Sequence, residues 1–268
     1  MSNVLEEIVA GVREDLAERM TRLPLDKIAA QAVEAPPSRD ALRALSGPRL
    51  SVISEVKRSS PSKGALADIP APADLARAYA TGGASAISVL TERRRFGGAL
   101  ADLDAVRAAV DLPVLRKDFV VEPYQVYEAR AHGADLVLLI VAALGDRQLA
   151  DLHKLALDLG LTPLVEVHTP DEASRAVDLG ARLIGVNNRN LKTLEVDLAM
   201  FETIVPLLPG DTVKVAESGI LLPEHAARVR AAGADAILVG EALVTANNPQ
   251  TAIAALIDGI ATHKFLFR

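Results

Sequence analysis

The stretch AGADAILVG, residues 232–240, joins the end of a helix-like segment to a short run of aliphatic residues. Gly followed by Ala is typical of a helix that ends in a glycine cap and leads into a buried parallel strand. The same pattern occurs three more times, as GGASAISVL (82–90), HGADLVLLI (132–140) and LGARLIGV (179–186). The sequence therefore repeats one strand-and-helix unit along its length.

The segments between these places complete a regular alternation of strands and helices. Amphipathic stretches, several with an acidic or Pro-containing first turn, separate the aliphatic runs. Eight such units in about 250 residues are typical of a closed barrel, whereas a doubly wound sheet usually needs fewer strands. We therefore predict an α/β fold, a (β/α)8 TIM barrel, with strands at 51–57, 86–91, 113–117, 136–141, 163–168, 182–187, 213–217 and 236–240.

The residues before the first predicted strand form an N-terminal extension. We predict a helical extension at 1–48, with a linker around 36–37, that packs on a single catalytic barrel domain at 49–268. Two roles stay open for it: a cap over an apolar barrel end, or a part of the active-site mouth. Its apolar residues at helical spacing are Val4, Ile8, Val12 and Leu16.

The composition narrows the choice of partners and compartment. A formal net charge of −6 without a long basic stretch argues against a nucleic-acid-binding protein. The chain has no Cys, which excludes thiol catalysis and is compatible with a reducing cytoplasm. No run approaches the roughly 20 apolar residues that cross a bilayer, and the N-terminus lacks the apolar core of a signal peptide. We expect a cytoplasmic protein without nucleic-acid or membrane partners, and a monomer, with a homo-oligomer left open.

Charged and polar side chains follow five of the predicted strands, at the barrel end where this fold carries its chemistry. In ISEVKRSSPSKG (53–64), Glu55 and Lys57 share one face of an extended chain. Because unpaired buried charge is costly, we expect both to face a shared polar cavity that holds positioned acids and bases. The polar strand ends are Glu55 and Lys57; Arg116, Lys117 and Asp118; Glu166 and His168; Asn187, Asn188 and Arg189; Glu217 and Ser218.

Two loops after the last strands predict a phosphate site. ESGI (217–220) and VGEAL (239–243) place small residues and free backbone N–H groups where barrels of this type bind phosphate. Ser60 and the loop around Gly64 are placed to close over it. The sequence lacks the motifs of P-loop nucleotide hydrolysis, zinc proteolysis and serine hydrolases. One strand-end histidine, His168, with scattered acids does not make a metal site, so we expect no metal.

Taken together, these motifs resemble the indole-3-glycerol-phosphate synthase family. The resemblance spans residues 51–245, and it implies a metal-free and cofactor-free enzyme of tryptophan biosynthesis. Its reaction closes the indole ring of 1-(2-carboxyphenylamino)-1-deoxyribulose 5-phosphate, with loss of CO₂ and water. The segments that carry the resemblance are EVKRSSPSKG, SVLTERRRFGG, LRKDFVVEPYQVYEARAHGAD, LVEVHTPDEA, IGVNNRNLKTLEVD, VAESGI and DAILVGEALV.

The resemblance also implies roles for single residues. Lys117 corresponds to the general acid that protonates the ketone oxygen, and Glu166 to a general base late in the sequence. Lys57 corresponds to the lysine that contacts the anthranilate carboxylate and acts in dehydration. Glu55 and Glu217 correspond to supporting carboxylates, and Asn187 to the residue on the anthranilate side. Expected substrate-binding residues are Ser60, Ser218, Gly219, Gly240 and Glu241 for phosphate, Arg189 near the carboxylate, and Phe96, Phe119 and Leu138 around the aromatic ring.

Two other functions compete with this interpretation. A barrel lysine in a polar mouth is also suited to a Schiff-base aldolase, although the sixth strand ends in Asn187 and not in Lys. A barrel that binds a phosphorylated metabolite or a protein without chemistry is the second alternative. The paired acids and bases argue against it, because phosphate binding alone does not need them.

Overall fold

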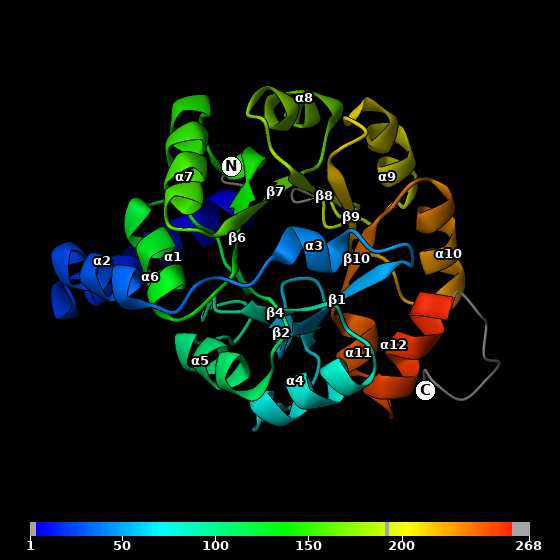
Figure 1. The fold of residues 1–268 in the computed structure, drawn as a ribbon, viewed down its shortest axis with the longest axis horizontal. Coiled ribbons are helices and arrows are strands. Elements are labelled where there is room, and N and C mark those ends of the chain that lie inside the picture. The colour runs from blue at the N-terminus through cyan, green and yellow to red at the C-terminus, as the bar shows by residue number, and fades with distance from the viewer. Residues whose placement is uncertain (1–3, 191–192, 259–268) are drawn as a thin grey trace.

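The structure is a computed structural model that describes residues 4–190 and 193–258, so the outer limits of the predicted segments, 1 and 268, lie outside the described residues. Eight parallel strands close into a barrel that a ring of helices surrounds (Figure 1). This confirms the predicted fold, and each strand end lies within one residue of its predicted position. In their order around the ring, the strands are β1 (Ser51–Val56), β10 (Ala236–Val239), β9 (Val213–Glu217), β8 (Leu183–Asn187), β7 (Thr162–Val167), β6 (Leu136–Ile140), β5 (Val114–Lys117) and β4 (Ala86–Leu90).

The repeated glycines end helices as the sequence predicts. Gly83, Gly133, Gly180 and Gly233 all have positive φ, between 76° and 112°, and each precedes the residues that lead into a strand. The helices before them are α4 (Pro72–Thr81), α6 (Pro123–Ala131), α8 (Pro170–Asp178) and α10 (Pro223–Ala231), and each begins with Pro, whose fixed φ suits a first helical turn. The other outer helices are α5 (Leu100–Ala109), α7 (Asp146–Asp158), α9 (Ala199–Ile204), α11 (Glu241–Val244) and α12 (Pro249–Asp258).

Alternate residues of each strand belong to two different cores. In β1, Val52 and Val56 pack toward the outer helices, whereas Ile53 packs inside the barrel with residues such as Leu115 and Leu164. This period of two is the side-chain alternation of a β-strand. The face of a strand residue therefore follows from its position in the sequence alone.

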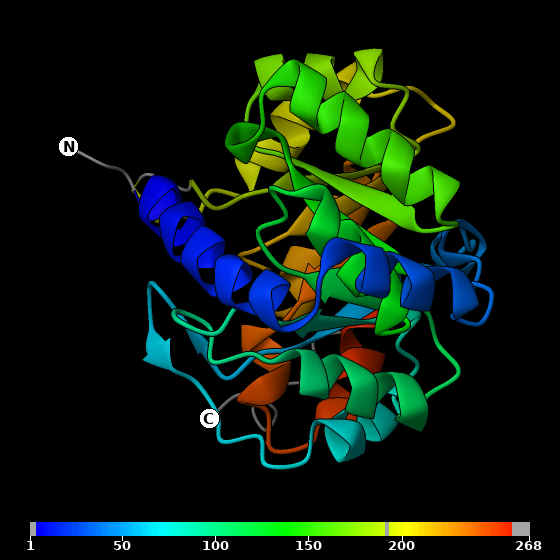
Figure 2. The ribbon, with the colours of Figure 1, turned by 90° about the vertical axis from the view of Figure 1, so that its left-hand side faces the viewer.

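The N-terminal extension contacts both ends of the barrel. It forms α1 (Val4–Arg22), α2 (Leu25–Glu34) and α3 (Ala41–Leu45). Helix α3 lies across the centre of the ring in Figure 1, and its Ala41 and Leu45 are fully buried against the barrel interior. Figure 2 shows α1 at the opposite end, where Leu5 and Ile8 join the same core, and α2 packs on α6.

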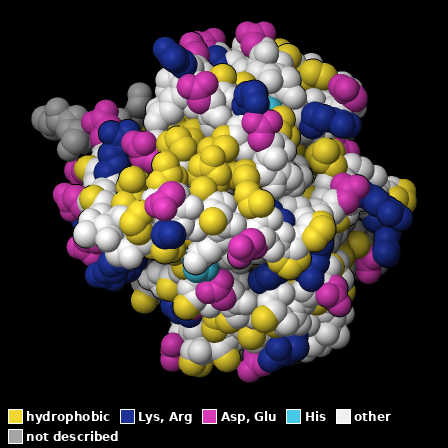
Figure 3. Space-filling view, turned by 60° about the vertical axis from the view of Figure 1, so that its left-hand side comes forward, with side chains coloured by type: hydrophobic (Ala, Val, Ile, Leu, Met, Phe, Trp, Pro, Cys, Tyr) yellow, Lys and Arg dark blue, Asp and Glu magenta, His cyan; other side chains and the backbone are white. Residues whose placement is uncertain are grey.

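The surface of the described part of the chain mixes both signs of charge. On the face drawn in Figure 3, acidic and basic side chains are interspersed around a group of hydrophobic side chains. Among the residues that the structure describes, no helix is long and apolar enough to cross a membrane.

Candidate active site

The charged residues at the strand ends continue the inward face of the barrel. Two residues beyond Ile53, Glu55 turns into the interior, and Lys57 follows it. Glu55 and Lys57 therefore line a polar cavity above the apolar core, as the sequence predicts. The structure brings every predicted site residue to this one cavity: Glu55, Lys57, Ser60, Phe96, Lys117, Phe119, Leu138, Glu166, Asn187, Arg189, Glu217, Ser218, Gly219, Gly240 and Glu241.

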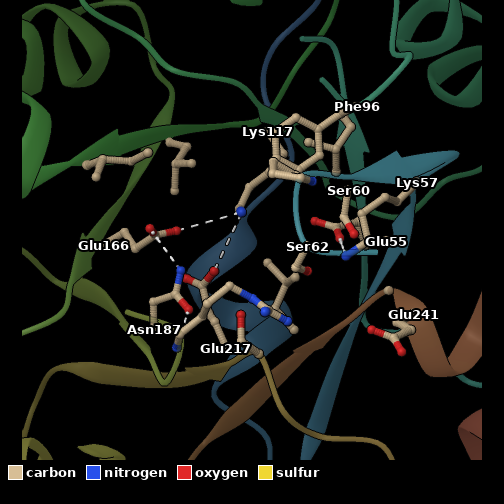
Figure 4. Close-up of a pocket in the computed structure, with 18 of the residues that line it drawn as sticks. Glu55, Lys57, Ser60, Ser62, Phe96, Lys117, Glu166, Asn187, Glu217 and Glu241 are labelled. Carbon is tan, nitrogen blue, oxygen red and sulfur yellow. Dashed lines mark hydrogen bonds and ion pairs between the residues drawn. The ribbon is translucent and has the colours of Figure 1, made fainter. Parts of the chain in front are cut away.

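Lys117 lies between two carboxyl groups at the centre of the cavity (Figure 4). Its Nζ is 3.7 Å from Glu166 Oε2 and 3.8 Å from Glu217 Oε2, and 16 % of its side chain is exposed. Burial opposes the charge of the ammonium, but the attraction of Glu166 and Glu217 outweighs it and raises the pKa of Lys117. Lys117 therefore carries a proton at neutral pH.

The two carboxyl groups around Lys117 have opposite protonation tendencies. Burial raises the pKa of both, but the charges of Lys117 and His168 and the Asn187 amide outweigh burial at Glu166 and lower its pKa. Asn187 Nδ2 donates a hydrogen bond of 3.1 Å to Glu166 Oε1. Burial and the nearby Glu166 carboxylate raise the pKa of Glu217. One buried base and one buried acid thus flank the same ammonium, a pattern typical of proton-transfer sites.

Glu55 and Lys57 form a second acid–base pair on β1. Lys57 Nζ lies 2.9 Å from Glu55 Oε1, and Ser88 Oγ donates to Glu55 Oε2 at 3.5 Å. Gly240 leaves room for the pair, because a Cβ at this position would lie 2.5 Å from Glu55 Oε1 and 3.1 Å from Lys57 Nζ. The pair therefore depends on a residue without a side chain at the end of β10.

A second glycine makes room for Glu217. Gly185 lies on β8, which pairs with β9, and a Cβ on Gly185 would lie 2.0 Å from Glu217 Oε1. No real side chain tolerates such a contact, so Glu217 occupies the volume that a larger residue at 185 would fill. Both glycines lie on inward positions, where a strand normally carries a packed side chain.

The loops after β9 and β10 form one side of the cavity mouth. Ser218 and Gly219 have φ of 64° and 77°, a left-handed conformation that is uncommon for Ser and recurs at functional sites. Gly240 precedes α11, and Gly240 and Glu241 line the cavity at the start of this short helix. Ser60 comes from the hairpin of β2 (Ser59–Ser60) and β3 (Gly64–Ala65), and Lys63 in its turn pairs with Glu241 at 3.0 Å. These groups are placed to bind an anion through the backbone.

The opposite side of the cavity is apolar and lies beside α1. The Phe96 and Phe119 rings are 6.1 Å apart between centroids, and Leu138 lines the same cavity from β6. Glu92, which is buried, holds the Phe96 loop by accepting the Phe96 backbone N–H at 2.9 Å. Arg189 is half-buried, and its guanidinium donates to the Leu194 carbonyl at 2.9 Å.

Two of the polar strand-end residues point away from the cavity. Arg116 is fully buried on the outward face of β5, where it pairs with Asp118 at 3.0 Å and Glu128 at 2.8 Å. Asn188 donates to the backbone carbonyls of Glu217 and Ser218 and so supports the loop after β9. Each is one residue out of phase with the inward positions, so neither was among the predicted site residues and neither lines the cavity.

The structure adds cavity residues that the sequence did not single out as site residues. Val4, Leu5 and Ile8 of α1 line the mouth, so the extension shapes the site as well as covering the barrel. Pro61, Ser62 and Leu194 line it from loops. The sequence signal for the α1 residues is the apolar stripe that includes Val4 and Ile8, and the loop residues lie in segments that carry the family resemblance. In the described residues no cluster of three His, Cys, Asp or Glu is arranged to hold a metal ion.

The fold and the cavity together define a (β/α)8 barrel with a cluster of acids and bases at the carboxyl ends of its strands, the end at which enzymes of this fold carry their active sites. A sequence model described as "Indole-3-glycerol phosphate synthase" matches residues 5–256. The chain belongs to this family, and it is a carboxy-lyase of tryptophan biosynthesis.

Relatives that bear the same description are similar over nearly the whole chain. The indole-3-glycerol phosphate synthase 1 of Streptomyces coelicolor is 60% identical over 255 residues, which cover 95% of each chain. That of Micrococcus luteus is 60% identical over 258 residues, 94% of this chain and 96% of the relative. The solved structure of a 3-hexulose-6-phosphate synthase superposes with a TM-score of 0.60 at 21% identity, covering 80% of this chain and all 100% of that one, which supports the barrel fold alone.

Proposed function

We propose that the chain closes the indole ring of 1-(2-carboxyphenylamino)-1-deoxyribulose 5-phosphate and forms indole-3-glycerol phosphate, CO₂ and water. One observation carries this proposal: Lys117 lies between two carboxyl groups, with an apolar wall on one side of the cavity and the loops after β9 and β10 on another. This arrangement matches a substrate with an aromatic acid at one end and a phosphate at the other.

The proton donor of the ring closure is Lys117. It donates to the ketone oxygen of the substrate while the ring carbon that bears the carboxylate attacks the ketone carbon. Its charge, held by Glu166 and Glu217, stabilises the developing oxyanion in a site that excludes most water. Loss of CO₂ then restores the aromatic ring.

The dehydration step uses the remaining groups. Lys57, paired with Glu55, contacts the anthranilate carboxylate and then protonates the leaving hydroxyl. Glu166 accepts the proton that the ring gives up, since its carboxylate is ionised. Glu217 binds a substrate hydroxyl, and Asn187 orients the anthranilate side through its contact with Glu166.

The substrate binds across the cavity mouth. The phosphate contacts Ser60 and the backbone N–H groups of Ser218, Gly219, Gly240 and Glu241. The aromatic ring packs on Phe96, Phe119 and Leu138, and Arg189 attracts the carboxylate at the edge. These residues are carried by different elements, so binding energy from both ends of the substrate fixes the reacting centre.

Purified protein mixed with this substrate in buffer with a chelator tests the proposal. Indole fluorescence that grows in proportion to protein concentration and persists with the chelator is expected. The chain has no Trp, so the product signal is read without tryptophan background. Binding of the substrate without any fluorescence increase would refute the proposed reaction.

The charge of Lys117 also opposes Schiff-base chemistry, which needs an unprotonated amine. Borohydride treatment in the presence of a ketose or aldehyde phosphate should therefore leave the mass of the protein unchanged. A stable adduct on Lys57 or Lys117 would favour the aldolase alternative.

The proposal extends to the organisation of the protein. Residues 1–48 and the barrel at 49–268 act as one catalytic unit, since α1 contributes to the cavity. The net charge of −6 argues against nucleic-acid partners, and the absence of Cys is compatible with a reducing cytoplasm. The proposed form is a cytoplasmic monomer. Light scattering on the purified protein measures the oligomeric state.

A further inference from the structure

His168 lies behind the proposed base, at the junction of β7 and α8. Its Nε2 is 3.2 Å from Glu166 Oε1, and its Nδ1 is 3.2 Å from Glu172 Oε2. The imidazole thus lies between two carboxylates, one in the cavity and one on the first turn of α8. Side-chain exposure rises along this row, from 2 % at Glu166 to 9 % at His168 and 17 % at Glu172.

Glu172 is itself fixed by the helix start. Its Oε2 accepts the His168 backbone N–H at 2.7 Å, and its own backbone N–H donates to Thr169 Oγ1 at 3.2 Å. Thr169 is the N-cap of α8. The carboxylate that contacts His168 is therefore held by the backbone and not by a flexible surface contact.

The two carboxylate oxygens of Glu166 have different partners. Oε1 accepts a hydrogen bond of 3.1 Å from the Asn187 amide, and it makes an ion-pair contact of 3.2 Å with His168 Nε2 that lies outside hydrogen-bond geometry. Oε2 has no hydrogen-bond partner in the part of the chain that the structure describes, and it faces Lys117 at 3.7 Å. Only Oε2 is thus left to accept a proton in the cavity.

We propose that His168 is a positioning residue: as an imidazolium anchored by Glu172, it keeps Glu166 ionised and fixes which of its oxygens faces the substrate. The inference rests on the proposed function, in which Glu166 is the base. His168 touches no reacting atom, and it acts through Glu166 alone.

The electrostatics agree with this geometry. Burial disfavours the charge on His168, but Glu166 and Glu172 outweigh burial and raise its pKa to about 9. On its other sides Glu166 faces Lys117 from β5, Asn187 from β8 and Glu217 from β9. The positive charge of His168 lies against Glu166, so it favours Glu166 as the ionised carboxylate of the pair and Glu217 as the carboxyl that keeps a proton.

The pH dependence of kcat/KM tests the proposal. His168→Gln removes the charge, so the pKa of Glu166 rises, and the acid limb of kcat/KM is expected to move up by at least about one pH unit. At pH 7, well above that limb, Glu166 stays ionised, so kcat should fall by no more than about threefold, through its lost orientation, while KM stays within about twofold. Glu172→Gln keeps an acceptor oxygen but removes the anchoring charge, and it should shift the limb in the same direction by less.

His132→Gln is the matched control. His132 pairs with Asp104 at the C-terminal end of α6, outside the cavity, so this variant should keep the wild-type profile. A purely structural role of His168 would lower kcat by the same factor at every pH. An unshifted acid limb in a folded His168→Gln variant overturns the proposal.

Two further measurements keep the proposal testable. If His168→Gln does not fold by circular dichroism, Glu172→Gln decides, and an unshifted limb there counts against the proposal. Nitrogen-15 histidine spectra of the wild type should show an imidazolium that persists above pH 8, and its loss below pH 7 would contradict the proposal. A wild-type protein that forms no indole product refutes the proposed reaction instead, and is thereby distinguished from a failure of His168.

Discussion

The lower and upper halves of the barrel interior are built from the same strands but hold opposite chemistry. In the lower half, Ile53, Leu115 and Leu164 pack beneath the cavity, and α3 covers them from below. Two residues further along the same strands are Glu55, Lys117 and Glu166. One step of the strand period thus separates a dry core from an acid–base site.

The difference teaches that position along a strand, and not local hydrophobicity, separates stability from activity. Strands β4, β6 and β10 remain apolar or small on their inward faces up to their ends, with Leu90, Ile140 and Leu238 at the cavity. These three strands supply the apolar wall of the cavity, and the other strands supply its charged residues. Substitutions one layer apart should therefore give opposite phenotypes.

The largest expected effect is the loss of activity when a charged residue of the upper layer is replaced. Lys117→Met should lower kcat by about 10³-fold or more, because it removes the proton donor of the ring closure. The variant should still fold, since the Glu166 carboxylate can take up a proton once the ammonium is gone. Product formation followed over hours measures kcat of this variant, and circular dichroism checks that it is folded. Near-normal turnover would show that Lys117 is not the proton donor.

Substitutions in the lower, apolar layer should reduce the stability of the protein and leave its activity largely unchanged. Leu115→Ala, two residues before Lys117, empties a fully buried position and should cost about 2–5 kcal/mol of unfolding free energy. We expect kcat to stay within about threefold of the wild type below the melting temperature. Urea unfolding and steady-state rates measure the two quantities, and a loss of activity without a loss of stability would break the comparison.

His168, which pairs with Glu166 of the upper layer, should make the unfolding free energy depend on pH. His168 has an ordinary pKa of 6.5 and a folded pKa of about 9, so its contribution is complete below pH 6.5 and is lost as pH rises through about 9. From about pH 6 to pH 10 the wild type should lose on the order of 3 kcal/mol more unfolding free energy than His168→Gln. Parallel denaturant titrations decide this, and equal losses would mean that His168 is uncharged.

A smaller effect should come from the glycine between the layers. Gly185→Ala pushes Glu217 away from Lys117 and should lower kcat roughly tenfold to 100-fold. Gly145→Ala is the control, because nothing lies within 4 Å of a Cβ there and its φ is negative. Equal activity in the two variants would show that the position of Glu217 does not matter to catalysis.

Much of this fold can be predicted from the sequence, because its signals are local. Each Gly-Ala pair marks a helix end that needs positive φ, as at Gly133 and Gly233, and the aliphatic run that follows is too short for a helix, which favours a buried strand. Parallel strands bring their carboxyl ends to one edge, so the residues of the site gather without any knowledge of the helices between them.

What the sequence did not predict depends on contacts between distant elements. The place of Ile8 over the cavity follows from how α1 crosses the barrel, and no local pattern encodes it. The contact of His168 with Glu172 needs the geometry of the β7–α8 turn. The outward direction of Arg116 could have been predicted, since it alternates with Lys117, but a run of three charged residues hides the phase.

The glycine beneath Glu217 also limits how this barrel can diverge. The space for one side chain is the missing side chain of the neighbouring strand, so a larger residue at Gly185 becomes acceptable only with a shorter one at Glu217. Gly240 has the same relation to Glu55. The two residues of each pair should therefore change together during evolution. A substitution at one of them damages the site, whereas a coordinated substitution at both can remodel it.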